Sequence, residues 1–134
     1  MVKVIPSQKG FTLVEALITC IIIAILVTIA MPIYMKAFEQ AQGAKAMENL
    51  RLIQAAQALY RTDSATYTSS TASLQSFTNF TINDGNWSYA IPTSGVSGFT
   101  ATGTRLSGQY TGRWISIDET ADIGYSDGAD SYPP

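Results

Sequence analysis

The sequence predicts an α+β protein in which one long N-terminal helix packs on a small antiparallel sheet. An uncharged apolar run extends from Ala16 to Met35, and an amphipathic pattern continues it to about Arg61. Short segments with alternating or β-favouring residues follow, separated by turns that contain glycine. With 134 residues, the chain has room for one small domain and one membrane helix.

The apolar run has the length of a membrane-spanning helix. Its 20 residues carry no formal charge and match what a helix needs to cross a hydrocarbon core of about 30 Å. Lys3 and Lys9 precede the run, so the positive-inside rule places the N-terminus in the cytoplasm. The rest of the chain is therefore expected on the other side of the membrane.

Glu15 lies at the edge of this span, where an ionised side chain is costly. On insertion scales, a charge at the bilayer centre costs about 3 kcal/mol. One explanation is an acid in the first helical turn, where it complements the positive end of the helix dipole. The other is a specific function for the carboxylate.

The stretch Lys9-Gly10-Phe11-Thr12-Leu13-Val14-Glu15, followed by an apolar helix, resembles the prepilin signal of type IV pilins and type II secretion pseudopilins. The resemblance covers residues 9 to about 61. It implies cleavage between Gly10 and Phe11 by a prepilin peptidase, and N-methylation of Phe11. It also implies a charge pair between the Phe11 amine of one subunit and Glu15 of a neighbour. Pro32 falls where the family has a helix-kinking proline.

The second half of the helix is expected to pack on the head domain. A helix from Phe11 to Arg61 has 51 residues and is about 75 Å long, far more than a bilayer requires. Its apolar stripe consists of Ala46, Leu50, Ile53, Ala56 and Tyr60. The expected divisions are a leader (1–10), a membrane or filament-core half (11–35), an amphipathic half (36–61), and a head with loop, sheet and acidic tail (62–134).

The head is expected to contain an ordered loop and then three or four strands in a meander. The loop spans Thr62 to Asn83, with a short helix or strand near Leu74 to Phe80. Strands are predicted from Trp87 to Ile91, Phe99 to Thr102, Leu106 to Tyr110 and Trp114 to Ile117. The rings expected to face the helix are Trp87, Tyr89, Tyr110 and Trp114; if exposed together, they would instead form the ligand platform of a membrane-anchored binding module.

The tail from Asp118 to Pro134 is acidic and lacks a basic residue. We expect a solvated loop held by packing of Ile123 and Tyr125, because Cys20 is the only cysteine and no intramolecular disulfide can form. The alternative is a Ca²⁺ site, since closely spaced carboxylates suit a hard cation. The candidate ligands are Asp118, Asp122, Asp127 and Asp130.

Composition argues against several classes of function. The chain has no histidine, and the only thiol lies in the apolar run, so we expect neither an enzyme nor a resident cofactor other than calcium. A formal net charge of −2 does not favour general nucleic-acid binding.

The resemblance implies a structural subunit of a helical pilus-like filament. Its partners would be identical subunits, the prepilin peptidase, an inner-membrane assembly platform and, before assembly, lipid. The precursor would cross the bacterial inner membrane once, and the assembled filament would be extracellular. The alternative is a periplasmic pseudopilin of a type II secretion or DNA-uptake system.

Overall fold

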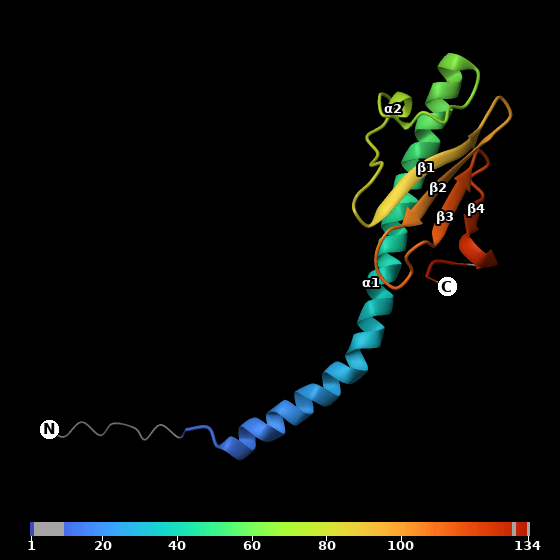
Figure 1. Ribbon diagram of the computed structural model, residues 1–134. Coiled ribbons are helices and arrows are strands. Elements are labelled where there is room, and N and C mark those ends of the chain that lie inside the picture. The colour runs from blue at the N-terminus through green and yellow to red at the C-terminus, as the bar shows by residue number, and fades with distance from the viewer. Residues whose placement is uncertain (2–9, 130, 134) are drawn as a thin grey trace. The chain divides into compact units, whose positions relative to one another are not determined.

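The computed structural model describes residues 1, 10–129 and 131–133, which form two compact units, Met1–Ala37 and Phe38–Pro134. Helix α1 (Leu13–Ser64) runs through both units. The second unit also contains α2 (Thr71–Leu74), β1 (Trp87–Ser94), β2 (Phe99–Arg105), β3 (Trp114–Asp118), β4 (Ile123–Tyr125) and the 3₁₀ turn η1 (Ser126–Gly128). The prediction of a long helix packed on a small antiparallel sheet is confirmed (Figure 1).

The first part of α1 has the features of a helix built for an apolar environment. Every residue from Gly10 to Ala37 is exposed, and within the described residues only α1 is long and apolar enough to cross a membrane. The hydroxyls of Thr19 and Thr28 donate to the carbonyls one turn earlier, at 2.7 and 2.8 Å. These bonds satisfy polar groups for which lipid would offer no partner. The helix continues through Pro32, and the kink there stays a prediction.

The second part of α1 buries the predicted stripe against the sheet. Ala46, Leu50, Ile53 and Ala56 are fully buried, and Tyr60 packs against them from a half-buried position. Apolar residues at intervals of three and four line one helix face, which explains why the periodic pattern predicted this contact.

The sheet is an antiparallel meander in the order β1-β2-β3-β4 (Figure 1). In the first three strands, alternate residues are buried toward α1, as the period of two requires. The buried inward set in the first three strands is Trp87, Tyr89, Ile91, Phe99, Ala101, Gly103, Arg105, Ile115 and Ile117. Pro92 lies in edge strand β1 where the pairing register shifts, a position that tolerates the missing N–H.

The predicted strand from Leu106 to Tyr110 is wrong. Strand β2 instead continues without interruption through Gly103 to Arg105, and residues 106–112 form turns. The backbone at Gly103 packs closely against the Tyr89 ring, because a Cβ at this position would lie 2.9 Å from Tyr89 Cε1. Sequence reasoning also missed β4, in which Ile123 and Tyr125 pack against the core as expected for the tail.

The four aromatic residues do not form one exposed platform. Trp87 and Tyr89 are buried beneath α1, which confirms core packing for these two. For the other two the prediction is wrong, because Tyr110 lies in a turn and Trp114, the first residue of β3, is 38% exposed.

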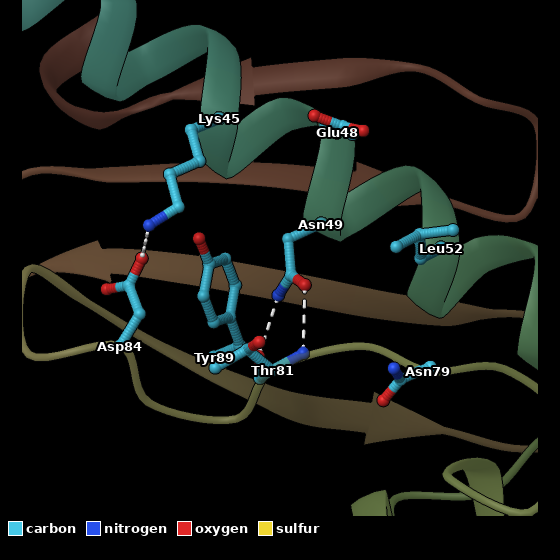
Figure 2. Close-up of a pocket in the computed structure, with 8 residues that line it drawn as sticks. All are labelled: Lys45, Glu48, Asn49, Leu52, Asn79, Thr81, Asp84 and Tyr89. Carbon is cyan, nitrogen blue, oxygen red and sulfur yellow. Dashed lines mark hydrogen bonds and ion pairs between the residues drawn. The ribbon is translucent and has the colours of Figure 1, made fainter.

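Two amide side chains of α1 hold the loop that precedes the sheet. Asn49 donates to the carbonyl of Thr81 at 2.7 Å and accepts from its backbone N–H at 2.9 Å (Figure 2). The fully buried Gln57 makes the same pair of bonds with Thr68, at 2.6 and 3.0 Å. Each amide satisfies both backbone groups of one loop residue, so the loop is fixed to the helix without extended strand pairing.

We predict that Leu50→Ala lowers the free energy of unfolding of the head by about 2–5 kcal/mol, because it leaves a cavity between α1 and the sheet. The matched control is Leu59→Ala on the same helix. Leu59 is half exposed, so its loss should change stability by no more than about 0.5 kcal/mol. Urea titration of the full chain in detergent, followed by tryptophan fluorescence, measures both changes, and equal effects would contradict this core.

Candidate functional site

The start of α1 is closed by a reciprocal pair of side-chain contacts between Thr12 and Glu15. The backbone N–H and the hydroxyl of Thr12 both donate to Glu15 Oε2, at 3.0 and 2.9 Å. The Glu15 N–H donates back to Thr12 Oγ1 at 3.2 Å. This arrangement is a capping box, which satisfies N–H groups that the first helical turn leaves unpaired.

The capping box uses one carboxylate oxygen of Glu15 and leaves the other oxygen free to accept hydrogen bonds. Glu15 is exposed, and its Oε1 makes no hydrogen bond to any described residue. One carboxylate oxygen therefore orders the helix start while the other remains accessible. The spacing Thr12-x-x-Glu15 is the sequence signature of this motif, and it could have been recognised in advance.

The proposed scissile bond precedes the helix. Gly10 and Phe11 are exposed and non-helical, and Phe11 is 76% exposed. Apart from Gly10 and its two chain neighbours, no described residue has an atom within 4 Å of the position that a Cβ on Gly10 would take. The described part of the chain thus imposes no steric demand for glycine there, whereas recognition by another protein could. The rest of the predicted leader, residues 2–9, lies outside the described residues.

Directly after this site comes an apolar surface that no described residue covers. Large apolar side chains are exposed all around the helix; they include Leu17, Ile18, Ile21, Ile22, Ile25, Leu26, Ile29 and Ile33. Cys20 lies among them as a free, exposed thiol. A contiguous apolar surface of this kind marks contact with a membrane or with other proteins.

Comparison with known proteins identifies the N-terminal signal. The family model described as the prokaryotic N-terminal methylation motif matches residues 5–31. A search of curated proteins gives no match. The chain carries the class III signal of type IV pilins and pseudopilins, and its fold is the type IV pilin-like α+β arrangement. The signal implies processing by a prepilin peptidase and assembly with like subunits, and it fits a membrane-anchored precursor.

The acidic tail does not assemble a metal site within the described residues. Asp118 Oδ1 accepts from the N–H and hydroxyl of Thr120, both at 2.8 Å, and from the N–H of Asp122 at 2.9 Å. This oxygen therefore closes the turn between β3 and β4. Among the described residues, no three His, Cys, Asp or Glu side chains lie close enough together to hold a metal ion. The Asp127 side chain and Asp130 lie outside the described residues, so calcium binding stays a prediction.

A polar cavity of about 170 Å³ lies between α1 and the loop before β1 (Figure 2). At its edge, Lys45 Nζ contacts Asp84 Oδ2 at 2.8 Å. Asp84 Oδ1 accepts from the N–H groups of Asn86 and Trp87, at 3.0 and 2.7 Å. Partial burial raises the pKa of Asp84, but Lys45 and these N–H groups outweigh burial and hold it below its ordinary value.

This lowered pKa predicts that Asp84 contributes to stability in a pH-dependent way. The contribution is present above the unfolded-state value of about 3.9 and is lost as pH falls through the lower folded-state value. We expect the free energy of unfolding of the full chain to fall below about pH 4, and to fall less steeply in Asp84→Asn. The control is Asp63→Asn, which removes an exposed acid that pairs with no described residue. Parallel pH profiles for wild type and Asp84→Asn would contradict the assignment.

Proposed function

We propose that the chain is a structural subunit of a type IV pilus-like filament, made as a membrane prepilin, cleaved after Gly10 and polymerised through α1. The observation that supports this most strongly is that the methylation motif at residues 5–31 coincides with a capped helix start and an apolar run whose described residues are all exposed. Lipid covers this surface in the precursor. In the filament, α1 helices of identical subunits replace the lipid.

Glu15 gives this assembly step its register. Glu15 is the only acid from Phe11 to Phe38, within an otherwise apolar helix. Cleavage frees the Phe11 α-amine, which has an unperturbed pKa of about 7.7–8.0 and remains a cation after methylation. In a low-dielectric core each charge alone is costly, whereas an incoming Glu15 opposite the amine of the preceding subunit pairs both. The unused Oε1 leaves room for this pair while Oε2 caps the helix.

The partners in this route are a prepilin peptidase, an inner-membrane assembly platform and further copies of the chain. Head-to-tail repetition of one contact generates an open helical polymer. The same signal also serves pseudopilins, whose filaments stay in the periplasm. Deletion of the gene separates the two: a pilin mutant loses surface fibres, whereas a pseudopilin mutant keeps them and loses protein secretion or DNA uptake.

We predict that Glu15→Gln blocks filament assembly and leaves membrane insertion intact. The substitution keeps the size and hydrogen-bonding capacity of the side chain but removes its charge. Removing one partner of a buried ion pair costs about 3–5 kcal/mol of stability, so the filament yield should fall at least about tenfold. Membrane precursor, processed subunit and sheared filament are quantified in parallel by immunoblotting.

The matched control is Glu48→Gln, which removes an exposed carboxylate from the second half of the same helix. It should leave all three fractions unchanged. A normal filament yield from Glu15→Gln would exclude the charge-pair mechanism.

A further inference from the structure

The residues that follow β4 return to α1 and end in a cluster of aromatic contacts around Tyr132. We call the described residues 126–129 and 131–133 the strap. The Tyr132 ring packs edge-on against Trp87 and Tyr110, with centroid distances of 5.1 and 5.8 Å. Its hydroxyl donates to Glu39 Oε2 at 2.9 Å. The ring lies so close to Gly43 of α1 that a Cβ there would overlap Tyr132 Cδ1.

The acceptor of this hydrogen bond is itself fixed by a buried ion pair. Glu39 and Arg105 are only 3% and 2% exposed. Arg105 donates to both Glu39 oxygens, from Nη2 at 3.0 Å and from Nε at 3.3 Å. Burial lowers the pKa of Arg105, but the Glu39 carboxylate more than offsets this and raises it. Tyr132 therefore binds to an acceptor that the Arg105 guanidinium holds in place through two hydrogen bonds.

Besides this contact, the described part of the tail is held by burial of Ser126 and Pro133 and by the short strand β4. Strand β4 has three residues and pairs with β3 through Ile115↔Tyr125, Ser116↔Gly124 and Ile117↔Ile123. All three β4 residues are only half-buried. Cys20 is the sole cysteine of the chain, so no intramolecular disulfide closes the tail.

We propose that Tyr132 is a latch: its hydroxyl on Glu39 and its ring against Gly43 keep the strap on α1 and thereby keep β4 on the edge of β3. When the latch opens and β4 leaves the sheet, β3 becomes an edge strand with unpaired backbone groups. Such an edge can pair with a strand from a second copy of the chain. The latch thus controls whether the head presents a closed or an open sheet edge.

Hydrogen exchange of the full chain in detergent, measured by mass spectrometry, tests the latch. Tyr132→Phe removes only the hydroxyl that binds Glu39. A hydrogen bond to a charged acceptor limits local opening, so exchange of β4 amides, and of β3 amides that face them, should rise about tenfold or more. The control is Tyr110→Phe, whose hydroxyl makes no hydrogen bond to any described residue. It should change exchange less than about twofold.

Gly43→Ala tests the same latch from the helix side. Alanine favours a helix more than glycine does, so the substitution should protect α1, yet its methyl group displaces the Tyr132 ring. We expect faster exchange in β4 and the strap together with unchanged protection in β1. Unchanged β4 exchange in both Tyr132→Phe and Gly43→Ala would overturn the proposal. So would an increase spread evenly over all four strands, because that pattern reports general loss of stability.

Discussion

The exposed apolar surface of α1 between Leu13 and Met35 is the constraint on which the biology of this chain depends. Nothing in the described residues covers it. Contact of these apolar side chains with water is unfavourable, so this half of the helix is more stable in contact with lipid or with other proteins. Glu15 is the single charge on that half before Lys36, and the capping box with Thr12 lets the carboxylate remain at the start of an apolar helix. In the proposed assembly route, cleavage before Phe11 supplies the opposite charge.

The second half of the same helix is covered within the chain, because it packs on the sheet in one defined register. Apolar burial around Leu50 and Ile53 provides most of the driving force, but apolar contacts alone specify position weakly. Polar contacts define the register of helix and sheet more narrowly. Asn49 and Gln57 each bind one loop residue, and Glu39 binds Arg105 at the end of β2. Displacing any of these groups leaves a polar partner unsatisfied, which makes alternative registers costly.

The sequence was most informative where structure follows a local period. The apolar run and the stripe through Ala46 and Ile53 predicted α1 to within a few residues at each end, because helical periodicity is visible over a short window. The capping box is equally local, because the Thr12-x-x-Glu15 spacing is visible within one helical turn. The strand predicted from Phe99 to Thr102 stops short of Gly103, because the close contact of Gly103 with the Tyr89 ring on another strand leaves no local signal in the sequence.

The latch could not be predicted from the sequence. Glu39 bonds to Arg105 across 66 positions and to Tyr132 across 93, and no short pattern links residues so far apart. In the sequence, Glu39 resembles any charged residue on the polar face of a helix. Only the fold shows that it is buried and that two donors converge on it.

The most direct test of the assembly route is the N-terminus of the subunit in filaments sheared from the cell surface. Intact-mass and peptide mass spectrometry should find this chain beginning at N-methylated Phe11, with Met1 to Gly10 removed. Filaments whose subunits retain Met1 to Gly10, or surface fibres that lack this chain altogether, would contradict the account.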